Sequence, residues 1–213
     1  MDDAHAPGTP LIRGDLADQR FLSATGISRI DVVDSTGSTN ADLLRGATVD
    51  PGAWPDLSVL TAEYQTAARG RLDRHWEAPP LSSVSVSVVL RPVNADGRPL
   101  PTQSYSWLSL IAALALRETL LEAARVPAEL KWPNDVLVRG RKIAGILAQL
   151  GPMADGNVPP VILGTGLNVT LRESELPVPT ATSVALEGGR TTDRTALRSE
   201  EHTSELQSRQ YLV

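Results

Sequence analysis

The sequence of 213 residues contains no cysteine and little histidine. Without thiols the chain can form no disulfide, no thiolate nucleophile and no cysteine-ligated zinc or iron–sulfur centre. The histidines, His5, His75 and His202, do not have the spacing of a zinc site. Neither a Gly-x-Ser-x-Gly elbow nor a Gly-x-x-x-x-Gly-Lys-Ser/Thr phosphate loop is present. The sequence therefore does not indicate catalysis through a side-chain nucleophile or a histidine-bound metal.

Long apolar runs and an excess of positive charge are also missing. No stretch approaches the ~20 apolar residues that cross a bilayer, and the acidic start, Met1-Asp2-Asp3, is not a signal peptide. The formal net charge of −5 argues against broad binding to nucleic-acid phosphates, which requires a basic face. These absences predict a cytoplasmic protein that binds neither membranes nor nucleic acid. Aromatic residues make up only 4% of the chain, so aliphatic side chains must form most of the core.

The length fits one domain with short extensions at both ends. Residues 1–26 are expected to form a partly disordered leader, because residues 1–10 are rich in Pro, Gly and Ala and the rest carries weak order signals. Residues 27–197 contain the strand and helix patterns. Residues 198–213 are polar, follow neither period and look like the translation of a sequencing adapter, so the tail is expected to be non-native and is excluded from fold reasoning.

Alternating and helical patterns predict a series of strands and helices. Strands are predicted at 30–34, 57–64, 84–90, 136–138, 142–148 and 160–169. A helix is predicted to follow the turn at 35–40, with Thr39 or Asn40 as its N-cap. A second helix is predicted over 104–125, and its apolar stripe, which includes Trp107, Leu114 and Leu121, is interpreted as core.

Two of these strands carry small residues at alternate positions. Ser83, Ser85 and Ser87 alternate with valines and are interpreted as the more polar face of their strand. Gly164 and Gly166 interrupt an apolar strand, where glycine marks either a β-bulge or the close approach of another backbone or a ligand. The pattern alone leaves both explanations open.

Cations and polar residues gather in a few short segments. Arg69-Gly70-Arg71 follows a strand, and such a segment is either a solvated charged loop or a loop that binds an anion through guanidinium and backbone N–H groups. The run Lys131-Trp132-Pro133-Asn134-Asp135 combines a cation, an amide and a carboxylate, and Lys142 begins the next strand. This set suits transfer at a phosphorus centre, where catalysis is mainly positioning and charge stabilisation. Asp135 is a candidate ligand of Mg²⁺.

Five motifs in this order resemble the signature of biotin–protein ligases. They are Ser38-Thr39-Asn40, Gln65 with Arg69-Gly70-Arg71, Lys131 to Asp135, Arg141 to Leu147, and Gly164 to Asn168. Any one motif is weak evidence, whereas the five in order across residues 27–197 are specific. The similarity is greatest to the actinobacterial, single-function type, which has no N-terminal DNA-binding domain.

The resemblance implies a fold and a reaction. The fold is α+β, with a mixed β-sheet and helices packed on one side, like that of class II aminoacyl-tRNA synthetases and lipoate ligases. The reaction joins biotin and ATP, with Mg²⁺, into biotinyl-5′-adenylate. The biotinyl group then passes to one lysine of a biotin carboxyl carrier domain of an acyl-CoA carboxylase.

The resemblance also assigns roles to individual residues. The implied biotin-binding set is Ser38, Thr39, Asn40, Gln65, Arg69, Gly70, Arg71, Lys142, Gly145 and Gly166. The implied ATP-binding set is Lys131, Asn134, Asp135 and Asn168, with Asp135 as the metal ligand. Arg71 and Lys142 are the expected catalytic residues, because they can screen the repulsion between a carboxylate and a phosphate. The arginine loop is the expected lid.

Other interpretations remain open. The chain could be a lipoate or octanoate ligase of the same fold, a non-catalytic biotin-binding or regulatory protein, or an inert fragment. The family usually carries a small C-terminal β-barrel, which is expected to be missing here.

Overall fold

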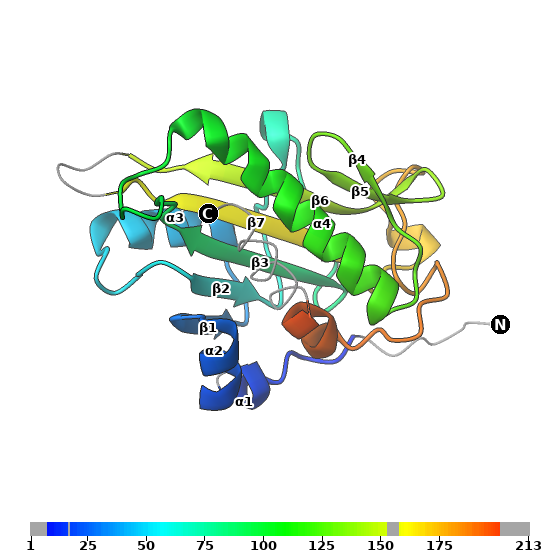
Figure 1. Ribbon diagram of the computed structural model, residues 1–213. Coiled ribbons are helices and arrows are strands. Elements are labelled where there is room, and N and C mark those ends of the chain that lie inside the picture. Colours follow the sequence, from blue (N-terminus) through cyan, green and yellow to red (C-terminus); the bar gives the residue numbers. More distant parts are fainter. Residues whose placement is uncertain (1–7, 17, 153–157, 201–213) are drawn as a thin grey trace.

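The computed structural model describes residues 8–16, 18–152 and 158–200, which fold around one seven-stranded sheet with the order β1-β2-β3-β7-β6-β5-β4 (Figure 1). The strands are β1 Arg29–Val33, β2 Ser58–Ala62, β3 Ser83–Leu90, β4 Glu129–Lys131, β5 Asp135–Val138, β6 Arg141–Leu150 and β7 Val161–Asn168. β1 and β2 run parallel, and all other neighbours are antiparallel. The predicted mixed sheet is therefore confirmed, and β4 is a strand that the sequence patterns missed.

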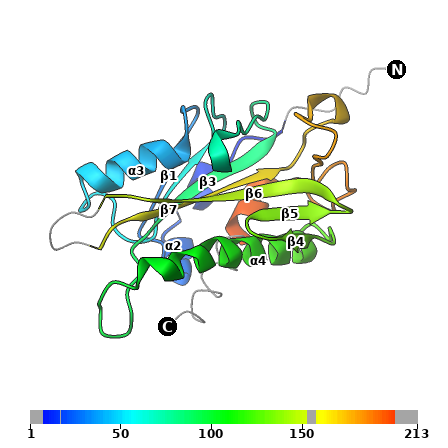
Figure 2. The same ribbon diagram turned by 90° about the horizontal axis from the view of Figure 1, so that it is seen from above.

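Helices cover both faces of this sheet (Figure 2). The α-helices are α1 Arg13–Leu16, α2 Gln19–Thr25, α3 Thr39–Val49 and α4 Ser106–Glu122, and short 3₁₀ helices occupy Arg71–Asp73, Thr102–Tyr105 and Glu173–Glu175. α4 packs on the face that carries Val84 and Leu163, whereas α3 packs on the opposite face, against Val89 and Ile162. The expectation that the helices pack on one side is corrected by α3. Its buried leucine, Leu43, needs an apolar surface, and the second face of the sheet provides one.

The outward side of α4 corrects another prediction. Leu116 and Leu120 are fully buried, but Trp107, Leu114 and Leu121 are 58%, 37% and 41% exposed. The interpretation of the whole apolar stripe as core is therefore wrong. α4 is apolar on most of its circumference, and the sheet can cover only one side of a helix.

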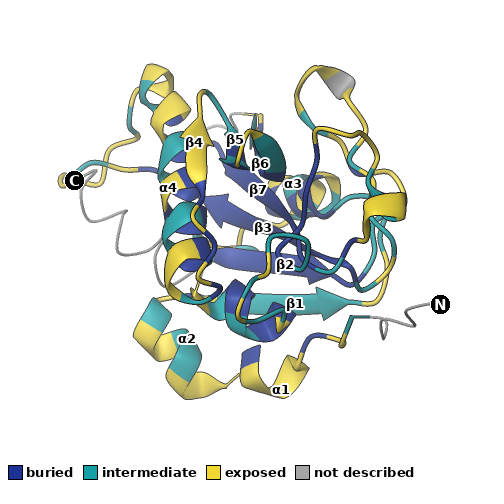
Figure 3. Cartoon of the chain, turned by 90° about the vertical axis from the view of Figure 1, so that its right-hand side faces the viewer, coloured by how far each residue is buried: buried dark blue, intermediate teal, exposed yellow. Residues whose placement is uncertain are grey.

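The alternating serines of β3 are not a solvated face. All eight residues of β3 are buried, as are all eight of β7 (Figure 3). A strand with one polar face is expected to bury only the other face, and this expectation is wrong because β3 lies between β2 and β7 in a sheet that is covered on both faces. The pairing of β7 with β3 and β6 continues without a register shift through Gly164 and Gly166, which excludes the bulge explanation.

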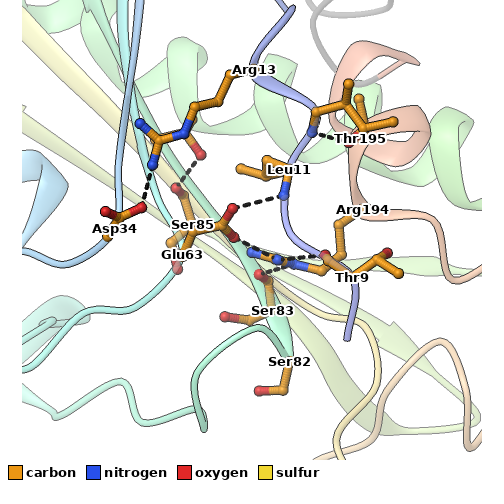
Figure 4. A network of polar contacts seen from close by, with 12 residues as sticks. Thr9, Leu11, Arg13, Asp34, Glu63, Ser82, Ser83, Ser85, Arg194 and Thr195 are labelled. Atoms are coloured by element: carbon orange, nitrogen blue, oxygen red, sulfur yellow. Dashed lines mark hydrogen bonds and ion pairs between the residues drawn. The ribbon is translucent and has the colours of Figure 1, made fainter. Parts of the chain in front are cut away.

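Residues 8–16 and 18–26, within the predicted leader, pack against the domain. Leu16 is fully buried, and the backbone N–H of Leu11 donates to Oε1 of Glu63 over 2.7 Å. Arg194 holds the same carboxylate: its Nη1 lies 2.6 Å from Oε2 of Glu63 and 3.0 Å from the carbonyl oxygen of Thr9 (Figure 4). One buried ion pair thus ties both ends of the described chain to the end of β2.

Arg194 belongs to a helical segment, residues 194–200. Within this segment Leu197 and Arg198 are fully buried, so residues 198–200 continue the domain although the sequence assigns them to the tail. The rest of the predicted tail, 201–213, and residues 1–7 of the predicted leader lie outside the described residues. None of the helices that the described ranges form combines the length and the apolar character needed to cross a membrane.

Candidate active site

One cavity of about 830 Å³ brings together every residue that the sequence assigns to the site. The predicted biotin set from Ser38 to Gly166 and the predicted ATP set, Lys131, Asn134, Asp135 and Asn168, all line it. These residues come from the start of α3, the loop after β2, the end of β4 and the turn that follows it, and the strands β5, β6 and β7. The volume lies within the range of about 300–1,000 Å³ typical of small-molecule sites.

Glycines on neighbouring strands, Gly145, Gly164 and Gly166, form the floor of the cavity, and serines of β3 pair with two of them. Gly145 of β6 pairs with Gly166 of β7, which pairs with Ser85 of β3. Gly164 pairs with Ser87 and lies beneath the side chain of Asn40. A Cβ atom at Gly164 would come within 2.0 Å of Oδ1 of Asn40, so glycine is needed there for α3 to approach the sheet.

Trp76 was not among the predicted site residues, yet it lies against this floor. A Cβ atom at Gly166 would approach Cε2 of Trp76 to 2.7 Å. The indole Nε1 is buried and has no hydrogen-bond partner among the described residues. Nζ of Lys142 lies 5.6 Å from the ring centre, within the range of a cation–π contact. The signal for Trp76 in the sequence was its position after an arginine-rich loop, in a chain that is poor in aromatic residues.

The first turn of α3 places polar groups at one end of the cavity. Ser38, not Thr39 or Asn40, is the N-cap, because its hydroxyl accepts the N–H of Ala41 at 3.4 Å. The prediction of Thr39 or Asn40 as the N-cap is therefore wrong by one or two residues. The backbone N–H of Thr39 donates to Oε1 of Gln65 over 2.8 Å, which joins the helix start to the loop after β2. Thr39 itself is only 3% exposed.

The side chain of Asn40 lies over Gly164 and reaches the neighbouring strand β6. Its Nδ2 lies 3.2 Å from the carbonyl oxygen of Leu147 and 2.9 Å from Oε1 of Gln149. Its Oδ1 lies 2.6 Å from the hydroxyl of Ser87, which is fully buried. Ser87, like Trp76, was missed. Its alternation with valines resembles that of any half-polar strand, and only its contacts distinguish it.

Lys142 and Asp135 form the charged centre of the site. Nζ of Lys142 is 2.6 Å from Oδ1 of Asp135, and the two side chains are 35% and 24% exposed. β5 and β6 are antiparallel neighbours, with Asp135 paired to Gly145, so the hairpin itself brings the two charges together. A ligand that carries more negative charge than Asp135 can compete with this carboxylate for the ammonium group of Lys142.

The arginine loop closes over the same region. Nη1 of Arg71 donates to Oδ1 of Asn134 over 3.3 Å, and Nδ2 of Asn134 donates to the carbonyl oxygen of Ile146 over 2.9 Å. Arg71 is exposed, as are Arg69 and Leu72 beside it. Leu72 has a φ of 57°, an unusual value for a leucine, within this turn.

The remaining predicted ATP residues lie at different depths. Lys131 is exposed at the end of β4 and lies opposite Asp135 in the antiparallel pairing of β4 with β5. Between these two residues lies a turn in which the Trp132–Pro133 peptide bond is cis. Asn168 is 3% exposed, and its Nδ2 donates to the carbonyl oxygen of Thr182 over 2.9 Å. Asn168 therefore also anchors the segment that follows β7.

The donor atoms of the site fit a divalent cation only with help from a ligand. The described residues contain no group of three or more His, Cys, Asp or Glu side chains that could hold a metal. Asp135 is the carboxylate in the cavity's charged centre, and one or two carboxylates plus phosphate oxygens are a usual Mg²⁺ environment. The arrangement is thus suited to a metal that arrives with a phosphate ligand.

Taken together, the cavity has a small-residue floor, a neutral polar end and a charged end. The neutral end consists of Thr39, Asn40 and Gln65, and the charged end of Arg71 and Lys142 with Asp135. A ligand with a neutral polar ring at one end and an acid at the other fits this distribution. An anionic second ligand can meet that acid at the cationic end.

Comparison with known proteins agrees with this geometry. Residues 32–168 match the Biotin/lipoate A/B protein ligase family. The chain is 44% identical over 202 residues to the biotin–[acetyl-CoA-carboxylase] ligase of Mycobacterium tuberculosis, covering 93% of this chain and 71% of that protein. It is 34% identical over 167 residues to the bifunctional ligase/repressor BirA of Bacillus subtilis, covering 77% of this chain and 47% of that protein. The chain thus spans about half the length of the Bacillus relative.

Solved structures show the same fold. The biotin protein ligase of Aquifex aeolicus in complex with biotin and ATP superposes with a TM-score of 0.68 at 25% identity, covering 87% of this chain and 72% of that one. The biotin protein ligase of Leishmania major in complex with biotinyl-5-AMP gives a TM-score of 0.65 at 22% identity, covering 84% and 74%.

Proposed function

The chain belongs to the biotin/lipoate A/B protein ligase family, and from this we propose that it is an ATP-dependent biotin–protein ligase. In the proposed reaction, a carboxylate oxygen of biotin attacks the α-phosphorus of ATP and pyrophosphate leaves. The amine of a carrier lysine then attacks the acyl carbon, and AMP leaves as the amide forms. No step requires a nucleophile from the protein, which is consistent with a chain that contains no cysteine.

One observation carries this proposal: Lys142, Asp135 and Arg71 line the same cavity as Thr39 and Gln65. The separation of charged and neutral ends matches biotin, whose carboxylate and ureido ring lie at opposite ends of an apolar chain. If these side chains lay on different faces of the molecule, no single ligand could meet both sets.

Lys142 is the residue that we propose to bring the two anions together. Its Nζ is held 2.6 Å from Asp135, so the ammonium is positioned before the ligands bind. A fixed cation lowers the repulsion between the attacking carboxylate and the phosphate and stabilises the charge that develops between them. Arg71 supplies a second cation from the loop, and closing that loop would keep water from the reactive anhydride.

The nucleotide is proposed to bind beside the β4–β5 turn. Lys131, at the end of β4, and Asn134, in the turn, line the cavity with Asn168. Mg²⁺ is proposed as the partner of Asp135 and the phosphates, where it would neutralise the charge of the leaving pyrophosphate. Because Asp135 already contacts Lys142, the metal and the lysine would share this carboxylate.

The acceptor is proposed to be a biotin carboxyl carrier domain of an acyl-CoA carboxylase. The Mycobacterium tuberculosis relative is named for acetyl-CoA carboxylase, and it is the relative with 44% identity over most of this chain. The Aquifex structure, at 25% identity, contains both biotin and ATP.

The direct test is to incubate the purified chain with biotin, ATP and Mg²⁺ and to measure pyrophosphate and biotinyl-adenylate. We expect both products in equal amounts, and no acyl-adenylate when lipoate or octanoate replaces biotin. Product from lipoate alone would favour the other activity of the family. Leu114→Gln, which alters the exposed side of α4 away from the cavity, is a matched control and should leave the yield unchanged.

A further inference from the structure

The backbone of Lys142 is held by a segment that lies outside the seven-stranded sheet. The pairing of β6 with β7 begins at Ala144, so it does not include Lys142. Residues 180–182, in the orange segment of Figure 1, take the place of β7 there. The N–H of Lys142 donates to the carbonyl oxygen of Thr180 over 2.7 Å, and its carbonyl oxygen accepts the N–H of Thr182 at 2.9 Å. This segment therefore fixes the backbone from which the ammonium group of Lys142 extends.

One buried carboxylate ties the same segment to the β5–β6 hairpin. The side chain of Glu187 is only 1% exposed, and its Oε1 lies 2.7 Å from Nη2 of Arg141. The same oxygen accepts the hydroxyl proton of Thr182 at 2.7 Å, and Oε2 lies 3.4 Å from Nη1 of Arg139. A carboxylate withdrawn from water is tolerated only with such partners, so these contacts resist any movement of the hairpin away from the segment.

The hairpin needs an anchor of this kind next to Lys142. The ion pair of Lys142 with Asp135 joins two residues of the same hairpin, so it cannot fix the hairpin relative to the rest of the cavity. The pairing of β5 with β6 is also irregular close by, with a register shift between Val136 and Leu137. Beyond β5 only the short strand β4 follows in the sheet.

The anchored residue is the immediate neighbour of Lys142. Arg141 and Lys142 are consecutive in β6, and successive side chains of a strand point to opposite faces. A partner that holds Arg141 on one face therefore directs Lys142 toward the other. Lys142 lines the cavity, whereas Glu187 is not among the residues that line it.

We propose that Glu187 is a positioning residue, which holds the β5–β6 hairpin against the segment after β7 and thereby places the ammonium of Lys142 where biotin and ATP react. The proposal rests on the proposed function, because it concerns the cation that brings the two anions together. Glu187 acts from behind the wall of the cavity and touches neither ligand.

Two carboxylates on one guanidinium provide a matched pair of variants. Glu187→Gln removes the charge of the buried partner of Arg141. Glu173→Gln is the control, because Oε2 of Glu173 lies 3.9 Å from Nη1 of the same arginine but its side chain is 72% exposed. Both variants lose one negative charge near Arg141, and only the first removes the buried anchor.

The rate of biotinyl-adenylate formation is measured in a single turnover at saturating biotin and ATP. Glu187→Gln should lower this rate about tenfold or more, since a displacement of about 1 Å in an active site can cost a factor of this size. The KM for biotin should change by a smaller factor, because the neutral end of the cavity is untouched. Glu173→Gln should keep the wild-type rate. A Glu187→Gln protein that is less stable but reacts at the wild-type rate when folded would overturn the proposal.

A double-mutant cycle tests whether Glu187 acts through Lys142. In a Lys142→Ala background, Glu187→Gln should leave the remaining rate unchanged, because no ammonium group is left to displace. Equal fold-losses in the two backgrounds would show that the two residues act independently, and would overturn the proposal.

Hydrogen exchange adds a measurement that does not depend on activity. The amide N–H of Lys142 should exchange about tenfold faster in Glu187→Gln, relative to the amides of β3 in the same molecule, because its hairpin is less firmly held. An unchanged ratio would overturn the proposal. If Glu187→Gln fails to fold, Arg141→Gln removes the other half of the contact from a side chain that is 32% exposed, and should give the same results.

The failure of this proposal can be distinguished from the failure of the proposed function. A wild-type chain that forms no biotinyl-adenylate would contradict the proposed function, and the exchange of the Lys142 amide would still test the anchor. A wild-type chain that forms the adenylate, with equal losses in the two backgrounds of the cycle, would contradict the role of Glu187 alone.

Discussion

The two faces of the central sheet are equally buried along β3 and β7 but consist of different residues. On the face toward α4, β3 presents Val84, Val86 and Val88, which pack into the main core. On the other face the same strand presents Ser85 and Ser87. β7 repeats the contrast, with Leu163 on the first face and Gly164 on the second.

The difference shows that burial alone does not identify core. Branched aliphatic side chains on the first face pack against α4 in the main core, and such interiors are close-packed in proteins generally. On the second face, small residues leave space for the ligand cavity and for the first turn of α3. Serine, which a pattern assigns to solvent, is here part of a buried polar network.

The largest effect on stability is expected at the edge of the core face. The carboxylate of Glu63 lies 2.6 Å from Nη1 of Arg194, which is fully buried. Glu63→Gln leaves this guanidinium without its charged partner. Breaking a buried pair in this way costs about 3–5 kcal/mol. Denaturant unfolding should show this loss, while biotin affinity measured on the folded fraction changes little. A stability within error of the wild type would contradict the structural role of the pair.

Neighbouring residues of β7 should respond in opposite ways. Leu163→Ala opens a cavity in the core, so it should cost about 2–5 kcal/mol of unfolding free energy and leave biotin binding largely intact. Gly164→Ala should displace Asn40, which its Cβ would approach to 2.0 Å, and so should weaken biotin binding far more than stability. Calorimetry and thermal unfolding on both variants measure the contrast. Similar profiles for the two would mean that the faces are not functionally distinct.

The charged end of the cavity should matter for chemistry more than for folding. Lys142→Ala is expected to lower the rate of biotinyl-adenylate formation about 10²–10³-fold, the cost of losing one fixed electrostatic stabiliser. Lys131→Ala, at the exposed edge of the same cavity, should lower this rate by a smaller factor. Single-turnover pyrophosphate release separates the two. Equal effects would indicate that net charge, rather than position, governs the reaction.

Arg71→Ala is expected to affect the adenylate more than biotin. The guanidinium is exposed and contacts Asn134, so free biotin should bind with nearly wild-type affinity. Retention of biotinyl-adenylate should fall about tenfold, because a charge-assisted bond to phosphate is lost. Dissociation rates of the two ligands provide the comparison, and a parallel loss of both would contradict this role.

The smallest effect is expected on the outer side of α4. Leu114→Gln replaces a side chain that is 37% exposed, so stability should change by no more than about 0.5 kcal/mol. Leu116→Ala, two residues further along and fully buried, should cost about 2–5 kcal/mol. A large loss at Leu114 would contradict the assignment of this side of α4 to the surface.

Much of the fold and of the site could be predicted from the sequence. Period-two and helical patterns located β1, β2, β3, β6, β7 and α4 to within a few residues. The charged motifs placed Arg71, Asp135 and Lys142 in one site, and the structure brings these residues to one cavity. The strand and helix predictions succeeded because periodicity is a local property of the chain, whereas the grouping of the charged motifs came from the resemblance to a known family.

The missed features depend on contacts between distant segments. Ser87 meets Asn40, which is 47 positions earlier, and Trp76 covers Gly166 across the cavity. Residues 11–26 give weak local signals, yet Leu11 is held by Glu63, 52 positions later. Such contacts have no trace in composition or periodicity.

The sequence by itself determined which residues alternate along each strand, and which charges cluster along the chain. Only the tertiary structure decided which face of each strand meets α4 and which meets the start of α3. The physical reason is that a period of two assigns side chains to two sides without saying what will cover either side. The covering element, packed from elsewhere in the chain, makes one side a core and the other a binding site.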